Sequence, residues 1–383
     1  MELDFLKPVS ADIISYTEAL SSQHFGSKVM MHSGTDFPDL SSVRIAIVGV
    51  LENRGKHLGY EEVDLNSIRK QLYALFPGNW DATVADLGDI APGNSLSDTY
   101  FAVQGVVSNL IKRKIMPIII GGTQDLTYAL YRAYDNLEQM VNLVSIDSRF
   151  DFGKHEGEIS ADSFLTKMLM DEPTNLFNYS NIGYQTYYNS QEEIDLIEKL
   201  FFDAYRLGEV CANISISEHV FRDADLVSLD LTSVKSSDSG NFVTFTPNGF
   251  NGKEVCALAR YAGISDRVSL FGIFNHGNSA QESVLIAQII WYFIEGINYR
   301  SNEYPFGSRE NYLKYTVPID DDQLVFYKSN KTDRWWIEIP YVSTGNNKLK
   351  RNTLLPCSYK DYEEACNQEL PGRWWKAQRK NML

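Results

Sequence analysis

Apolar runs alternate with amphipathic stretches through the first three hundred residues, and the run from Met116 to Ile120 organises the others. Its four apolar residues are interrupted only by Pro117, which is the pattern of a strand buried on both faces. A Gly-Gly pair follows, and then apolar residues at helical spacing: Leu126, Ala129, Leu130 and Ala133. The stretch therefore predicts a strand, a tight turn and a helix.

Two later apolar runs also have the pattern of buried strands, and both end in acidic residues. They are Leu143 to Asp151 and Leu226 to Thr232. Ligands of open parallel sheets bind at the carboxyl ends of the strands. We therefore expect the three strand ends to meet in one crevice that is rich in carboxylates.

The remaining pattern favours the same architecture. It predicts strands at 43–49 and 268–275, a short edge element at 85–90, and helices at 65–76, 98–112 and 283–296, with a further helix starting at the capping box 190–193. Alternation of buried strands with amphipathic helices specifies a mostly parallel sheet with helices on both sides. The sequence thus predicts a three-layer α/β/α domain.

We divide the chain into a lead-in over 1–42, the α/β domain over 43–300 and an α+β extension over 301–383. The extension alternates at first like an antiparallel hairpin and ends as two short helices broken at Pro371-Gly372. It holds four of the six tryptophans, which are the partner-binding candidates: Trp335, Trp336, Trp374 and Trp375. Paired tryptophans beside basic residues are typical of a protein-binding patch. The alternative is that they anchor the extension on its own domain.

Charge and composition narrow the function classes. The formal net charge of −15 argues against a nucleic-acid partner, and because residues 305–383 carry +3, the first 304 residues carry −18. The four cysteines lack metal-ligand spacing and are expected to be buried free thiols in a reducing compartment: Cys211, Cys256, Cys357 and Cys366. The N-terminus lacks signal-peptide features and no apolar run is long enough for a membrane span, so we expect a cytoplasmic protein without membrane insertion.

The three strand ends resemble, in order and separation, the metal-binding signatures of the ureohydrolases (arginase, agmatinase and formimidoylglutamase). The signatures G-G-D-H-S, D-A-H-x-D and S-x-D-x-D-x-x-D-P correspond here to G-G-T-Q-D, D-S-R-F-D and S-L-D-L-T, most similar to a bacterial formimidoylglutamase-like branch with degenerate motifs. The resemblance implies an arginase-like fold and a binuclear manganese hydrolase that splits guanidino or formimino groups. It also implies a trimer or hexamer, although a monomer or dimer stays open because the extension could cover an oligomer surface.

The ligands that the resemblance implies do not all carry over. Asp147, Asp151 and Asp230 match aspartates of the family. Gln124 and Arg149 stand at the two histidine positions, and Thr232 stands at an aspartate position. Ile273 replaces a glutamate that, in the family, helps to hold the guanidinium of the substrate. We therefore expect a pocket at these positions that has lost most of the manganese site.

The surviving charges decide which cofactor we expect. The three aspartates and Arg149 sum to −2, half the charge of the family's ligand set. Because a guanidinium keeps its proton, we hypothesise that Arg149 replaces the metals through charged hydrogen bonds to the aspartates, and we expect no cofactor. The alternative is one manganese ion on the three aspartates, with Arg149 turned to solvent. His155 could approach the crevice, but its pattern is more typical of a surface loop.

These observations leave three functional hypotheses. The first is a ureohydrolase-fold protein without catalysis that serves as a binding or scaffold component of a protein assembly, with a partner on the extension. The second is a formimidoylglutamase-like hydrolase that cleaves a formimino or guanidino C–N bond with a reduced metal site. The third is a metal-free pocket that binds a small anionic or amino-acid ligand through Arg149.

Overall fold

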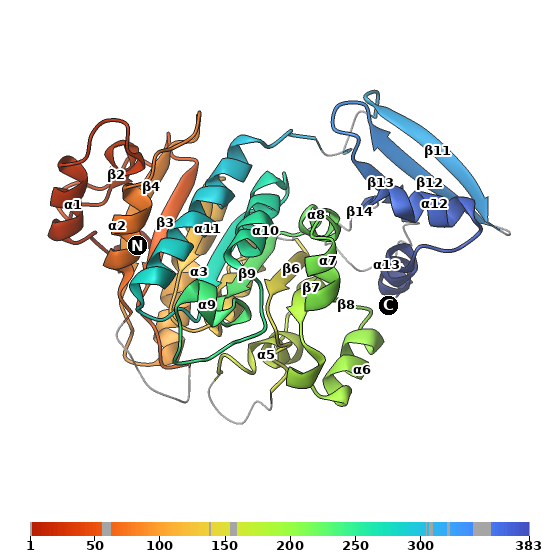
Figure 1. Cartoon of the computed structure of the whole chain (residues 1–383), viewed down its shortest axis with the longest axis horizontal. Helices are drawn as coiled ribbons and strands as arrows, with labels where there is room; N and C mark the ends of the chain where they lie inside the picture. Colours follow the sequence, from red (N-terminus) through yellow and green to blue (C-terminus); the bar gives the residue numbers. More distant parts are fainter. Residues whose placement is uncertain are drawn as a thin grey trace.

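The structure of the chain is a computed structural model, shown in Figure 1. It describes residues 2–55, 63–137, 139–153, 159–303, 305, 309–319, 322–339 and 354–382. A large sheet forms the centre of the molecule, and a smaller antiparallel sheet with two helices lies at one end of it (Figure 1).

The large sheet of the described residues is parallel except at one edge. Its order is β1-β4-β3-β5-β10-β9-β6-β7-β8, with β2 also paired to β4. The core strands are β3 Ile45–Val50, β4 Val84–Ile90, β5 Met116–Ile120, β6 Val141–Ile146, β7 Leu176–Tyr184, β8 Asp203–Arg206, β9 Leu226–Asp230 and β10 Leu270–Phe274. Every pair among these eight is parallel, as the alternation of strands and helices predicted.

Helices cover both faces of this sheet. They are α1 Ala11–Glu18, α2 Leu65–Tyr73, α3 Leu96–Lys112, α4 Leu126–Arg132, α5 Phe164–Met170, α6 Gln191–Lys199, α7 Leu207–Ala212, α8 Ile216–Phe221, α9 Ser236–Ser239, α10 Gly252–Ile264 and α11 Ala280–Asn298. Ile118 packs in the core cluster with α2, α10 and α11, whereas its neighbour Ile119 packs in the cluster with α3 and α4. Figure 1 shows α11 and α10 in front of the sheet and α3 behind it. The three-layer prediction is confirmed.

Several predicted elements differ in detail. The lead-in contributes two short strands, β1 Leu6–Lys7 and β2 Met30–Met31, and both pair with β4, so 85–90 is not an edge. The capping box is confirmed: the Ser190 hydroxyl accepts from the Glu193 N–H, and the Glu193 carboxylate accepts from the Ser190 N–H.

The extension is an antiparallel sheet of four strands and two helices. Its elements are β11 Tyr312–Ile319, β12 Asp322–Ser329, β13 Trp335–Glu338, β14 Leu354–Cys357, α12 Tyr359–Cys366 and α13 Gly372–Met382. The predicted hairpin corresponds to β12 and β13, which pair antiparallel, and the two helices flank Pro371 as expected. The strands β11 and β14, at the two ends of the sheet order, were not predicted.

The extension packs on the α/β domain through its basic residues. Arg334 forms an ion pair with Glu218 of α8 at 3.1 Å, and Lys376 forms one with Asp203 of β8 at 3.1 Å. Basic residues of the extension therefore pair with acidic residues of the α/β domain in the same chain.

This packing corrects the expectation for the tryptophans. Trp335, Trp336 and Trp374 are 7%, 1% and 3% exposed, so their rings are inside the chain and are not available to a partner. Trp375 is 40% exposed and packs edge-on against Phe201 of the domain. Most of the tryptophan surface thus serves to fold and anchor the extension.

The structure bears on the expectations for the cysteines and for membrane-spanning helices. All four cysteines are free thiols, but only Cys256 and Cys357 are buried, whereas Cys211 and Cys366 are exposed. Over the described ranges, no helix combines the length and the apolar character that a bilayer crossing requires.

Candidate functional site

The predicted crevice lies where four neighbouring strands end. In the order β5, β10, β9 and β6, these strands deliver Gln124, Asn275, Asp230 and Asp147 to the same edge of the sheet. The turn after β5 requires glycine, because a Cβ on Gly122 would lie 1.8 Å from the carbonyl oxygen of Glu52. The Gly-Gly pair thus lets the chain turn sharply and places Gln124 at the mouth of the sheet.

A cavity of about 340 Å³ opens over these strand ends. Its lining includes five of the six residues at the family's metal positions: Gln124, Arg149, Asp151, Asp230 and Thr232. The sixth, Asp147, is fully buried and bonded to Gln124 at 2.7 Å. Residues of all three motifs thus lie at or next to one cavity. His155 lies outside the described residues.

Amide groups hold the carboxylates of the pocket. The Nε2 of Gln124 donates to Asp147 at 2.7 Å, and the Nδ2 of Asn275 donates to Asp230 at 2.9 Å. Asn275 also donates to the Oε1 of Gln124 at 3.3 Å, so the two amides are linked to each other. The network is possible because β10 runs between β5 and β9 and brings Asn275 between the two other side chains.

Arg149 does not act as the sequence suggested. Its exposed guanidinium lies over the ring of Tyr188, 4.4 Å from the centroid, and its Nη1 donates to the carbonyl oxygen of Tyr188 at 3.4 Å. The bond that it gives to an aspartate of the pocket comes from its backbone N–H, to Asp147 at 2.9 Å. The hypothesis that its side chain replaces the metals through hydrogen bonds to the three aspartates is therefore corrected.

Without that cation, the carboxyls resist ionisation. Burial raises the pKa of Asp147 to about 8, and repulsion from Asp230 adds to the effect. Burial, and then repulsion from Asp147 and Asp230, holds the pKa of Asp151 well above its ordinary range. Asp147 and Asp151 also share a side-chain hydrogen bond. Both carboxyls are therefore harder to ionise than an exposed aspartate.

The fit of these residues to a binuclear manganese centre is poor. The metal positions in the pocket offer no imidazole, and amide N–H groups occupy oxygens of Asp147 and Asp230 that would otherwise face a cation. Among the described residues, no group of three or more histidines, cysteines or acids is placed to hold a metal ion. One feature points the other way: the Oδ2 of Asp151 is buried without a hydrogen-bond partner in the described structure. That no cofactor binds stays a prediction.

The structure also shows which position after β10 reaches the pocket. Ile273, at the family's glutamate position, is fully buried in the apolar core and is not among the residues that line the cavity. Asn275, two residues later, lines it with a left-handed φ of 57°, a conformation that asparagine tolerates. Sequence reasoning missed Asn275, although it is the first polar residue after the strand β10.

Comparison with known proteins agrees with this geometry. The family model described as "Arginase family" matches residues 54–271. The curated formimidoylglutamase of Cupriavidus pinatubonensis is 24% identical over 229 residues, which cover 54% of this chain and 67% of that protein.

Two solved structures of similar fold come from Trypanosoma cruzi and Bacillus subtilis. Trypanosoma cruzi formiminoglutamase with manganese is 17% identical, with a TM-score of 0.63 over 69% of this chain and 97% of its own. Bacillus subtilis formimidoylglutamase is 14% identical, with a TM-score of 0.60 over 75% and 99%. At such identities the likeness shows the fold.

Proposed function

Because the chain belongs to the arginase family, we propose that it is a ureohydrolase-fold protein that has lost most of the binuclear manganese site and acts as a binding or scaffold component of a protein assembly. The family model covers more than half of the chain. Three of the six metal positions carry other residue types, and these are Gln124, Arg149 and Thr232.

One observation carries the proposal: the amides of Gln124 and Asn275 donate to the carboxylates that would face a metal. A metal ligand must offer a free lone pair, whereas Asp147 accepts an amide N–H from Gln124. The family's reaction needs a hydroxide produced by two metals. The polar side chains of the described pocket supply no substitute for it.

The alternative function is a formimidoylglutamase-like hydrolase that cleaves a formimino or guanidino C–N bond with a single manganese ion on Asp147, Asp151 and Asp230. The observation in its favour is the buried, unpartnered Oδ2 of Asp151 at the cavity. The similar proteins named formimidoylglutamase make that substrate the first to assay.

Metal content and hydrolysis separate the two functions. Full-length protein is purified with manganese, dialysed and read by elemental analysis, and then assayed for formamide release from formimidoylglutamate. We expect a manganese content near zero and no formamide above the buffer blank. One or two equivalents of manganese together with formamide release would overturn the proposal in favour of the alternative.

A restored variant supplies the matched control. Gln124→His, Arg149→His and Thr232→Asp together return the family's residue types at the three altered positions. We expect the triple variant to retain manganese through the same dialysis, because imidazole and carboxylate then replace an amide, a cation and a hydroxyl. Equal manganese content in the triple variant and the natural chain would mean that these positions do not decide metal binding.

A further inference from the structure

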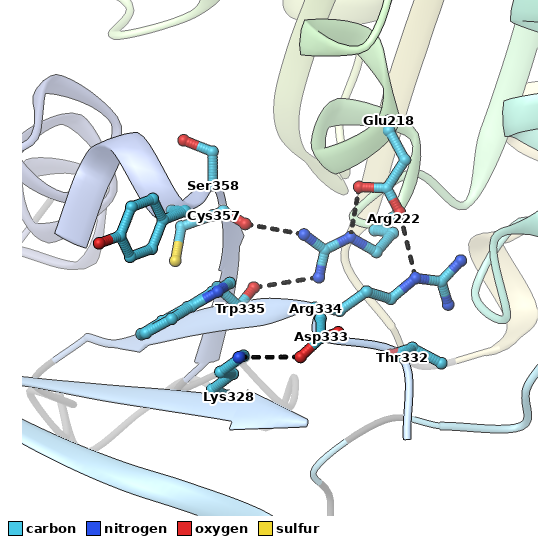
Figure 2. A pocket seen from close by; sticks show the side chains of 10 residues that line it. Glu218, Arg222, Lys328, Thr332, Asp333, Arg334, Trp335, Cys357 and Ser358 are labelled. Atoms are coloured by element: carbon cyan, nitrogen blue, oxygen red, sulfur yellow. Dashed lines mark hydrogen bonds and ion pairs between the residues drawn. The ribbon is translucent and has the colours of Figure 1, made fainter. Parts of the chain in front are cut away.

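A second cavity, of about 530 Å³, lies where the extension meets the α/β domain. Figure 2 shows it between α8, which contributes Glu218, and the strands of the extension, which contribute Trp335 and Cys357. It shares no lining residue with the pocket at the strand ends. The proposed function leaves this cavity without a role.

Two guanidiniums in this cavity share one carboxylate. The Oε2 of Glu218 accepts from the Nε of Arg222 at 3.0 Å, and its Oε1 pairs with the Nε of Arg334 at 3.1 Å (Figure 2). Asp266 is only a distant second partner, 4.0 Å from Arg334, and it also accepts from Ser301. The two cations are thus incompletely compensated although their side chains are 6% and 14% exposed.

Both arginines keep donors that these contacts do not use. Arg222 gives one bond each to the carbonyl oxygens of Trp335, at 3.0 Å, and Cys357, at 2.8 Å, which leaves two of its five N–H groups. Arg334 gives its Nη1 to Ser301 at 3.0 Å, and its Nη2 has no hydrogen-bond partner in the part of the chain that the structure describes. Forked N–H donors of this kind recognise carboxylate and phosphate oxygens.

The lining also holds one exposed aromatic side chain, Tyr359. Trp335 and Tyr359 have ring centroids 5.6 Å apart, and Tyr359 is 54% exposed. Lys328 lies 5.9 Å from the Trp335 ring and is paired with Asp333 at 2.8 Å. Burial raises the pKa of the Cys357 thiol.

We propose that this cavity binds a small organic anion, with its carboxylate or phosphate group at Arg334 and Arg222 and its planar body against the exposed ring of Tyr359. The lining holds three cationic and two acidic side chains, so it is net positive in a chain of net charge −15. The volume is in the range of small-molecule sites, and the combination of apolar walls with a few converging donors is typical of them.

The competing explanation is that the two arginines only dock the extension. Docking alone requires the bonds to Glu218 and to the backbone carbonyls, and it gives no affinity for an added anion. The two explanations therefore differ in one measurable property, which is binding that depends on the charge of the ligand and on Tyr359.

The test uses benzoate and its neutral isostere benzamide as probes of the full-length chain, each titrated at low ionic strength by ligand-observed NMR. We expect saturable binding of benzoate, and binding of benzamide that is weaker by about tenfold or more, because a charged hydrogen bond is roughly twice as strong as a neutral one. Phenyl phosphate, titrated in the same way, decides whether phosphate or carboxylate is preferred. Equal affinity for benzoate and benzamide, or no saturable binding of either anion, would overturn the proposal.

Variants locate the binding. Arg334→Gln is expected to weaken benzoate binding by about tenfold, and Tyr359→Ala is expected to weaken it too while leaving the fold intact, since the side chain is largely exposed. Lys360→Gln is the control, because Lys360 is 82% exposed, pairs with Glu364 and is not part of the lining. If Arg334→Gln unfolds the extension, Tyr359→Ala decides alone. Unchanged affinity in Tyr359→Ala would sink the proposed site.

Discussion

The guanidinium of Arg149 lies over the ring of Tyr188, with its Cζ atom 4.4 Å from the ring centroid. The carboxylates at the strand ends are therefore not neutralised by its side chain, and Asp147 and Asp151 keep raised pKa values. A cation at a metal position thus serves here as a surface contact.

Removing Arg149 should have a small effect on stability. Arg149→Ala is expected to lower the free energy of unfolding by about 0.5–1 kcal/mol, the value of an exposed cation–π contact. Urea unfolding monitored by circular dichroism measures it. A loss of more than about 3 kcal/mol, as for a broken buried ion pair, would instead show that the side chain neutralises the aspartates in solution.

The side-chain hydrogen bonds of Asn275 should contribute to the free energy of unfolding, in addition to any effect of its left-handed backbone. Asn275→Ala removes the donors to Asp230 and Gln124, which are buried, and should cost about 1–3 kcal/mol for the unsatisfied groups. Asn302→Ala is the control, because Asn302 has a similar φ of 50° but is exposed. Urea unfolding of both variants gives the difference. Equal losses would mean that the amide network does not stabilise the site.

The junction with the extension should weaken in acid. Burial, helped by Arg373 and Arg222, holds the pKa of His219 well below its ordinary value, so the histidine is neutral when folded. The unfolded chain then binds more protons below about pH 6.5, and stability falls as pH drops, by at most about 1.4 kcal/mol per pH unit. His219→Gln should show a shallower loss of stability between pH 7 and pH 5 in thermal unfolding. Parallel curves for the two proteins would contradict this role.

Arg222 should be the most sensitive residue of the junction. Arg222→Met leaves the carbonyl oxygens of Trp335 and Cys357 without their buried donor and should cost about 3–5 kcal/mol. Arg309→Met is matched to it. Arg222 lies over the ring of Trp336 and Arg309 over that of Tyr327, but Arg309 is 39% exposed, so its replacement should cost less than about 1 kcal/mol. Urea unfolding of both variants gives the free energies. Similar values for the two would argue that Arg222 is not an anchor.

Deleting residues 305–383 tests whether the extension is integral. The truncated chain would expose the surface around Arg222, which is 6% exposed in the complete chain, and would leave Asp203 without Lys376. We expect it to be found in the insoluble fraction on expression. A soluble, cooperatively folding core would instead identify the extension as a separate module.

The sequence predicted the parts of the fold whose signal is local. The apolar runs of β5, β6 and β9 and the capping box at Ser190 each depend on residues that are close in the chain. The strand β7 was missed because Asn178, Ser180 and Asn181 interrupt its apolar pattern, and these polar residues are buried. The Nδ2 of Asn181 donates to the carbonyl oxygen of Arg149, which lies far from it in the sequence.

By itself, the sequence indicated the layered architecture through its periodicity, and its three motifs indicated the family and the meeting of Gln124, Asp147 and Asp230 at neighbouring strand ends. Only the tertiary structure decided where side chains point. From charge alone, we expected the side chain of Arg149 to contact the aspartates. It instead contacts the ring and the carbonyl oxygen of Tyr188 at the surface, where a cation keeps its hydration. The contacts of a long side chain depend on segments that are distant in the sequence, and a local sequence pattern does not specify where those segments lie.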